Sequence, residues 1–271
     1  MERDKFTTLI SLKKEDIVMG NKKLLIGLFA AFWLSLISQS LFAQANNLAK
    51  IYFVNVKSGH DAEFVAALKE HVEWRKQAGD PWTWYVYQIV NGKKLGDFVI
   101  RSSGHSWADL DSYEEFLTKG AVEFNKNVGP HVESISNAIT SGDTTNINWY
   151  PNNDDVNLIS VTTYHLKPGQ GRAFTQAVNK YHTAIIENNR ESYYAFAWTV
   201  NGGPGPRVTL ALPYKNWAEM QGPDESLRAF MVRILGSEEA QQLADEFNST
   251  YNSVESSVLR LRRDLSVIPD R

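Results

Sequence analysis

The sequence predicts a mixed α+β protein built from two tandem copies of one β-α-β-β-α-β unit. Three observations support this fold class. The chain has 271 residues, of which 43% are hydrophobic and 12% aromatic, so a large core can be buried. Segments 56–64 and 166–174 resemble each other at an offset of 110 residues. Strand-like and helix-like hydrophobic patterns then follow in the same order in both copies.

The repeat extends far beyond its first segment. At the same offset, residues 90–92 and 200–202 both read Val-Asn-Gly, and Trp107-Ala108 matches Trp217-Ala218. At a larger offset, 123–125 and 246–248 both read Glu-Phe-Asn, and 132–134 and 254–256 both read Val-Glu-Ser. Matches that keep their order over the whole chain indicate a tandem duplication.

Each copy follows one plan of strands and helices. A first strand rich in β-branched and aromatic residues ends at a Lys-x-Gly turn, a helix follows, and an Asn-Gly pair closes a hairpin. The first copy is predicted to contain strand 50–56, helix 60–77, strands 82–90 and 97–103, a helical region starting near Trp107, and strand 132–140. The second copy is predicted to contain strand 158–166, helix 170–188, strands 193–200 and 207–213, a helical region starting near Trp217, and strand 254–263. The order is that of a ferredoxin-like unit.

The first helix of each copy has one face that should pack on the sheet. In the first copy this face carries Phe64, Ala67, Leu68, His71 and Arg75, at helical spacing. The corresponding residues of the second copy are Phe174, Ala177, Val178, Tyr181 and Ile185. His71 is therefore expected between helix and sheet, where a polar ring needs a partner or a cavity.

The first 45 residues have the pattern of an export signal. A basic pair, Lys22-Lys23, precedes an apolar run at 24–37, and Ala43-x-Ala45 supplies a cleavage pattern. An uncleaved anchor is the alternative, although the run is shorter than the roughly 20 residues of a membrane span. Residues 1–18 precede a better start at Met19. We therefore predict an upstream extension and signal peptide at 1–45, a first repeat at 46–142, a linker at 143–156, and a second repeat at 157–271.

Charge and cysteine content exclude several classes. The net charge of −3 would become −5 after loss of the six basic and four acidic leader residues, so nucleic-acid binding is not expected. Without cysteine, the chain has no disulfide, cysteine nucleophile or thiolate metal site. No His-x-x-x-His or similar spacing indicates a metal, so we predict neither a metal nor a cofactor. A periplasmic or secreted location fits these features, with no membrane association after signal cleavage.

The two ferredoxin-like copies resemble the dimeric α+β barrel superfamily, fused in one chain. The resemblance rests on the Lys-x-Gly turn, the Phe-led helix, the Asn-Gly hairpin and the Trp-Ala-Asp/Glu helix start, and it covers nearly all of 48–265. That superfamily includes stress-responsive barrel proteins, antibiotic-biosynthesis monooxygenase-like proteins, NIPSNAP-like proteins and chlorite dismutase-like haem proteins. The resemblance implies one barrel formed by both sheets, a monomer, and a ligand held between sheet and helices. It assigns no functional residue.

Three residues are candidates for proton transfer: His71, Tyr87 and Arg101. A histidine on a buried helix face is an acid–base candidate, and its alternative is a core histidine bonded to a backbone carbonyl. Arg101 lies in mid-strand, where it either faces a cavity and binds an acidic group or points outward. Tyr87 and Arg101 are expected to be the polar strand residues nearest His71. Without an anion beside it, a partly buried His71 should have a lowered pKa.

Five further residues are candidates for ligand binding: Asn55, Arg75, Trp84, His165 and Tyr181. Asn55 and His165 match at the offset of 110, at the ends of the two first strands, and Arg75 and Tyr181 lie on the inner helix faces. Trp84 belongs to an aromatic strand. For each, core packing or a solvated strand end is the alternative.

The sequence is compatible with two functions, and a third is less favoured. The first is an exported protein that binds a small apolar or aromatic molecule. The second is a cofactor-free enzyme, of monooxygenase, cyclase or lyase type, that uses His, Tyr and Arg for proton transfer. The third, a haem protein, is weakest because no histidine is singled out as a proximal ligand.

Overall fold

The structure is a computed structural model, and it describes residues 46–268. The signal peptide, its cleavage site and the upstream extension predicted from the sequence lie outside the described residues. Residues from Asn46 onward form one compact unit. The boundaries predicted for the two repeats and the linker remain predictions.

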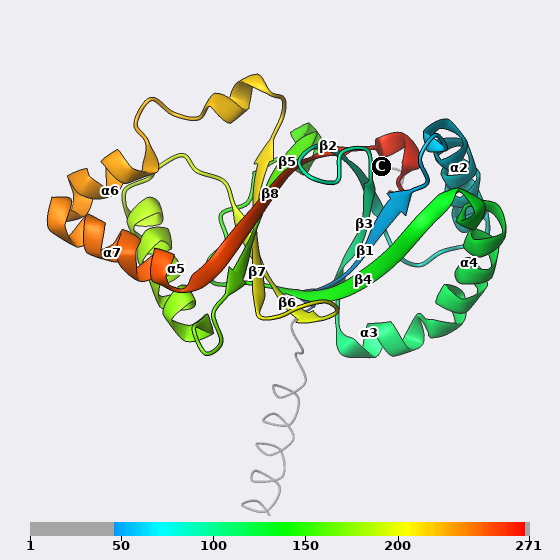
Figure 1. Ribbon diagram of the computed structural model, residues 1–271, viewed down its shortest axis with the longest axis horizontal. Coiled ribbons are helices and arrows are strands. Elements are labelled where there is room, and N and C mark those ends of the chain that lie inside the picture. Colours follow the sequence, from blue (N-terminus) through cyan, green and yellow to red (C-terminus); the bar gives the residue numbers. More distant parts are fainter. Residues whose placement is uncertain (1–45, 269–271) are drawn as a thin grey trace, which may run out of the picture. The chain divides into compact units, whose positions relative to one another are not determined.

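The two halves contain the same succession of strands and helices (Figure 1). The first half consists of β1 (Leu48–Val56), α2 (Asp61–Gln77), β2 (Tyr85–Asn91), β3 (Phe98–His105), α3 (Trp107–Ser112), α4 (Glu114–Asn127), η1 (Gly129–His131) and β4 (Val132–Gly142). After η2 (Asn153–Asp155), the second half consists of β5 (Leu158–Leu166), α5 (Gly171–Glu187), β6 (Ala195–Asn201), β7 (Arg207–Tyr214), η3 (Ala218–Gln221), α6 (Leu227–Leu235), α7 (Ser237–Ser249) and β8 (Tyr251–Leu261). The short η4 (Arg263–Leu265) follows β8.

The strands close into one antiparallel barrel in the order β1-β3-β2-β8-β5-β7-β6-β4. Each half contributes a four-stranded sheet of the same order, β4-β1-β3-β2 and β8-β5-β7-β6. The halves join where β2 pairs with β8 and β4 pairs with β6. The predicted fold class, two tandem ferredoxin-like halves in one fused α+β barrel, is confirmed.

Strand alternation separates the barrel interior from two outer layers. Ile51, Phe53 and Val99 point inward, into an apolar cluster that also contains Ile159 and Leu259 from the second half. The outward-facing residues of the first sheet pack against α2 and α4, and those of the second sheet pack against α5, α6 and α7. Figure 1 shows the two helical layers on opposite sides of the barrel. Two separate sheet–helix spaces result, one in each half.

The structure corrects three of the expected elements. β2 starts at Tyr85 rather than at residue 82, because the Trp82 N–H bonds to the Asp80 side chain instead of a strand. The helical region near Trp217 is only the short 3-10 turn η3, and α6 and α7 follow it. β8 starts at Tyr251, three residues before the expected strand.

The repeated Val-Glu-Ser triplet is not in structural register. Val132 pairs with Val56, and Tyr251 pairs with Leu166, so the last strands correspond at an offset of 119 residues. The first half inserts η1 between its helix and strand, whereas α7 leads into β8 through Thr250 alone. Within residues 46–268, no helix is both long and apolar enough to span a bilayer.

Candidate functional site

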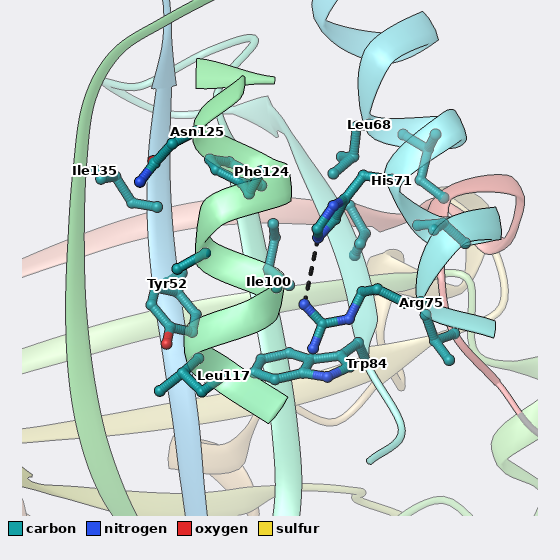
Figure 2. A pocket seen from close by; sticks show the side chains of 16 residues that line it. Tyr52, Leu68, His71, Arg75, Trp84, Ile100, Leu117, Phe124, Asn125 and Ile135 are labelled. Carbon is teal, nitrogen blue, oxygen red and sulfur yellow. Dashed lines mark hydrogen bonds between the residues drawn. The ribbon is translucent and has the colours of Figure 1, made fainter. Parts of the chain in front are cut away.

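A cavity of about 150 Å³ lies between the first sheet and helices α2 and α4 (Figure 2). It is lined by Tyr52, Leu68, His71, Val72, Arg75, Trp84, Val86, Ile100, Leu117, Gly120, Ala121, Phe124, Asn125, Ile135, Leu265 and Val267. Ile135 is 49% exposed, so the cavity reaches the surface beside β4. A cavity of this volume accepts a molecule of about one aromatic ring.

Most of the wall is apolar, and the polar groups gather mainly at one end. His71 and Arg75 project from α2 toward Trp84, whereas Tyr52, Ile135 and Asn125 lie on the other side (Figure 2). Ligand sites commonly combine apolar walls with a few convergent polar groups. The cavity therefore has an orienting end and an apolar body.

The turn that ends α2 places a carboxylate, Asp80, beside Arg75. Gly79 has a φ of +72°, its N–H bonds to the Lys76 carbonyl, and the Asp80 N–H bonds to the Arg75 carbonyl at 3.0 Å. This pair of bonds is a Schellman motif, which needs a left-handed residue after the helix. The motif turns Asp80 back beside Arg75.

Asp80 is a fully buried carboxylate with a complete set of donors. Its side chain is 0% exposed and accepts from Arg75 Nε at 2.6 Å and from Trp84 Nε1 at 3.1 Å. The Tyr113 hydroxyl donates to its second oxygen at 2.9 Å, and so does the Trp82 N–H. A buried charge requires this kind of pairing.

Arg75 is held in one orientation by four neighbours. Its Nε pairs with Asp80, its Nη2 donates to the Tyr113 hydroxyl, and its guanidinium lies 4.9 Å from the centre of the Trp84 ring. Nη1 approaches His71 Nε2 at 3.3 Å. Burial raises the pKa of the Tyr113 hydroxyl, so that it stays a neutral donor to Asp80.

His71 joins this network to a second carboxylate. Arginine can only donate, so Nε2 of His71 accepts from Arg75, and Nδ1 carries the proton that it donates to Glu123. The other Glu123 oxygen accepts from Asn127 Nδ2 at 2.6 Å. The tautomer of His71 is thereby set by its partners.

His71 is 3% exposed, as expected for a residue between helix and sheet. Burial lowers the pKa of His71, and the charge of Arg75 adds to this, while Glu123 opposes it. The predicted direction is confirmed, but the predicted absence of an anion is wrong, because α4 places Glu123 against the ring. A neutral imidazole with a carboxylate on Nδ1 and a lone pair at the cavity end can act as a base.

The structure brings together three of the residues predicted from sequence: His71, Arg75 and Trp84 all line the cavity. Tyr87 and Arg101, expected nearest to His71, point to the other face of the sheet, because their neighbours Val86 and Ile100 line the cavity. That expectation was wrong. Burial raises the pKa of Tyr87 and lowers that of Arg101 inside the barrel.

The remaining predicted residues lie elsewhere. Asn55 donates to both oxygens of Asp97 at 2.8 Å, beside a second, much smaller hollow. His165 occupies the matching strand end of the second half, paired with Arg207. Tyr181 packs against Phe247 in the other sheet–helix space.

Sequence reasoning missed Asp80, Tyr113, Glu123 and Gly120. Asp80 had a usable signal, since a glycine directly after a helix ending in basic residues indicates a Schellman turn. Glu123 belongs to the repeated Glu-Phe-Asn triplet, but the repeat does not predict that α4 packs with Glu123 against His71. Tyr113 separates α3 from α4, a break that the pattern did not show.

The described residues do not offer a metal or haem site at this place. No cluster of three or more His, Cys, Asp or Glu side chains suited to a metal occurs within residues 46–268. The cavity is smaller than a porphyrin, and both imidazole nitrogens of His71 have protein partners. The residues lining this cavity do not fit haem.

Comparisons with known proteins support the fold alone. No sequence family matches the chain, and no curated protein matches it. An anthrone oxidase-like protein aligns with a TM-score of 0.51 and 11% identity over 82% of this chain and 93% of its own. A proposed monooxygenase from Fusobacterium nucleatum aligns with a TM-score of 0.52 and 10% identity over 79% and 91%.

A chlorite dismutase from Candidatus Nitrospira defluvii aligns less well, with a TM-score of 0.48 and 10% identity over 82% and 94% of the two chains. The anthrone oxidase-like protein and the proposed monooxygenase share the α+β barrel fold of this chain.

Proposed function

We propose that this chain is a small-molecule-binding protein whose ligand occupies the cavity between the first sheet and helices α2 and α4. The observation that carries the proposal is the arrangement of the wall, in which apolar side chains surround one polar end formed by His71 and Arg75. The volume of about 150 Å³ suits a compound of one ring. We also propose that the protein is exported and monomeric, because its leader has a signal pattern and one chain closes the barrel.

The binding proposal is tested by filling the cavity. A Cβ on Gly120 would lie 3.4 Å from Arg75 Nη1, so the longer side chain in Gly120→Leu would project into the space that a ligand needs. Ligand-observed NMR with toluene should show binding to the wild type and none to G120L. Val122→Leu is the control, because Val122 lies on the same helix and is 68% exposed. Equal toluene binding by wild type and G120L would contradict the proposal.

A second candidate function is a cofactor-free enzyme in which His71 removes a proton from a bound carbon acid. The contact of Glu123 with Nδ1 favours it, because this contact directs the basic Nε2 toward Arg75 and the cavity. Arg75 would stabilise the negative charge that develops on the substrate oxygen.

Deuterium exchange separates the two functions. In deuterated buffer, the α-protons of cyclohexanone should exchange faster when wild-type protein is present than in buffer alone. Glu123→Gln should remove most of this increase in exchange rate. Cyclohexanone that binds without faster exchange would leave binding as the function and reject the enzyme.

A further inference from the structure

The polar end of the cavity has an uneven balance of charge. Arg75 and Asp80 form an ion pair and neutralise each other. Glu123 is contacted by His71 and by the neutral amide of Asn127. The charged groups around His71 are Glu123 from α4, Arg75 from α2 and Asp80 from the following turn. Tyr52 lies on the other side of the cavity (Figure 2). With a neutral imidazole, this end carries one uncompensated negative charge.

The donors available at this end are also limited. Arg75 uses Nε for Asp80 and one N–H of Nη2 for Tyr113, and Nη1, which lies beside Gly120 in the cavity wall, is the nitrogen placed for a ligand. His71 Nε2 lies beside Arg75 Nη1 and carries a lone pair, which repels an anionic oxygen. One proton on Nε2 changes both features, because it creates a second donor and cancels the charge of Glu123.

We propose that the cavity takes a single-ring organic acid in its anionic form, and that His71 Nε2 binds one proton as the anion enters. The acidic oxygen then accepts hydrogen bonds from Arg75 Nη1 and from protonated His71, while the ring occupies the apolar body of the cavity. The carboxylate enters as the anion, and the buffer acid supplies the proton that binds to Nε2. This inference rests on the proposed function and names its ligand class.

In the ligand-free site, His71 is in its neutral form and can still bind a proton. Burial and Arg75 lower the pKa of His71, so the imidazole is neutral before an anion arrives. An anion next to the ring has the opposite effect, because it favours the charged form. Anion binding and proton binding therefore strengthen each other, as linkage requires.

Calorimetry with benzoate and benzamide tests the proposal, because the two probes share shape and differ in charge. At pH 7.5, titrations in two buffers of different ionisation enthalpy report the protons exchanged. Benzoate should take up one proton, and benzamide should take up none and bind about tenfold more weakly or worse. His71→Gln should abolish the uptake and weaken benzoate binding by about tenfold. His165→Gln, in the other half, should change neither.

Two further measurements keep the test decisive. If H71Q fails to fold, the wild-type dissociation constant for benzoate should still rise about tenfold between pH 7 and 8, as uptake of one proton demands. Phenol, which is neutral at this pH, should bind without proton uptake, because its hydroxyl can donate to the lone pair of Nε2. Proton uptake on phenol binding would show that uptake does not depend on the anion and would contradict the proposal.

The possible failures are distinguishable. Benzoate that binds as weakly as benzamide, or without proton uptake, while displacing toluene would overturn the acid proposal and leave the cavity function intact. If toluene, benzoate and benzamide all fail to bind, the proposed function fails as well.

Discussion

The two halves share a backbone plan but differ in the space between sheet and helix. In the first half this space holds the cavity and the network from Asp80 to Glu123. In the second half aromatic rings meet there, with Tyr164 5.5 Å from Phe174 and 5.4 Å from Phe247 between ring centres. Burial raises the pKa of Tyr164 to about 12. The same fold thus holds a cavity in one half and packed aromatic rings in the other.

Single positions account for the difference. His71 and Arg75 correspond to Tyr181 and Ile185 at the offset of 110. When the two Glu-Phe-Asn triplets are aligned, Gly120 of the first half corresponds to Leu243 of the second. Leu243 is 2% exposed and belongs to the same buried cluster as Ile185. The first half therefore has a glycine and a charge where the second has apolar bulk.

The turn after the first helix shows the same contrast most clearly. In both halves a left-handed residue, Gly79 or Asn189, follows the helix, and its N–H and the N–H of the next residue make the same pair of backbone bonds. The next residue is Asp80 in the first half and Arg190 in the second. Asp80 is a fully buried carboxylate that pairs with Arg75, whereas Arg190 is a buried arginine that reaches the partly exposed Glu225. One backbone motif thus positions a buried carboxylate in one half and a buried arginine with a more exposed partner in the other.

Removing the Asp80 carboxylate should produce the largest change in stability. Asp80→Ala leaves the Arg75 guanidinium buried without its counter-charge, which costs about 3–5 kcal/mol in free energy of unfolding. Glu225→Gln, which removes the carboxylate partner of Arg190 in the second half, should cost about 1 kcal/mol or less, because Glu225 is partly exposed and Arg190 keeps its hydrogen bond to the Glu225 carbonyl. Urea denaturation measures both. Equal losses would show that the two turns carry similar energies.

Exchanging bulk between the halves should come next. Leu243→Ala opens a void in the second half and should cost about 2–5 kcal/mol, because a buried leucine is truncated. Gly120→Leu fills part of the existing cavity in the first half and should cost only about 1–3 kcal/mol, from crowding against Arg75. Denaturation curves of both variants test this. A larger loss for G120L would mean that the cavity closes in solution.

The dependence of stability on pH should come in part from His71, in the first half. The pKa of His71 is lowered in the folded state, so unfolding takes up a proton as the pH falls through the ordinary value of about 6.5. The free energy of unfolding should therefore fall between pH 7.5 and 5.5, by about 1.4 kcal/mol for each unit of pKa lowering at the limit. His105, whose pKa burial also lowers, contributes in the same direction.

His71→Gln isolates the contribution of His71, and its stability should depend less steeply on pH in this window. Wild-type and H71Q curves of equal slope would contradict it. His71→Phe is a poorer probe than His71→Gln, because Glu123 and Arg75 would both lose a hydrogen-bond partner.

Repeat and periodicity were enough to predict two ferredoxin-like halves, because the order of elements follows from the β-α-β-β-α-β succession and the hydrophobic faces. The joining of the two sheets in one barrel was implied by the resemblance to the dimeric α+β barrels. They also placed His71 and Arg75 on the inner face of α2. They did not give the partners, since Glu123 and Tyr113 come from a helix whose rotation depends on packing. The strand face of Arg101 was equally open, because β3 is apolar on both sides. The sequence offered no measure of the space left beside Gly120.

The smallest expected effect concerns the left-handed residue of the shared turn. Asn189 adopts a φ of +50°, which glycine tolerates better because it has no Cβ. Asn189→Gly should therefore raise the free energy of unfolding by about 0.5 kcal/mol, and Gly79→Asn should lower it by a similar amount. Thermal melts of both variants check the pair, with changes of opposite sign expected. A loss of several kcal/mol in G79N alone would mean that glycine itself is required to seat Asp80 against Arg75, and the two turns would then differ in their backbone as well as in their side chains.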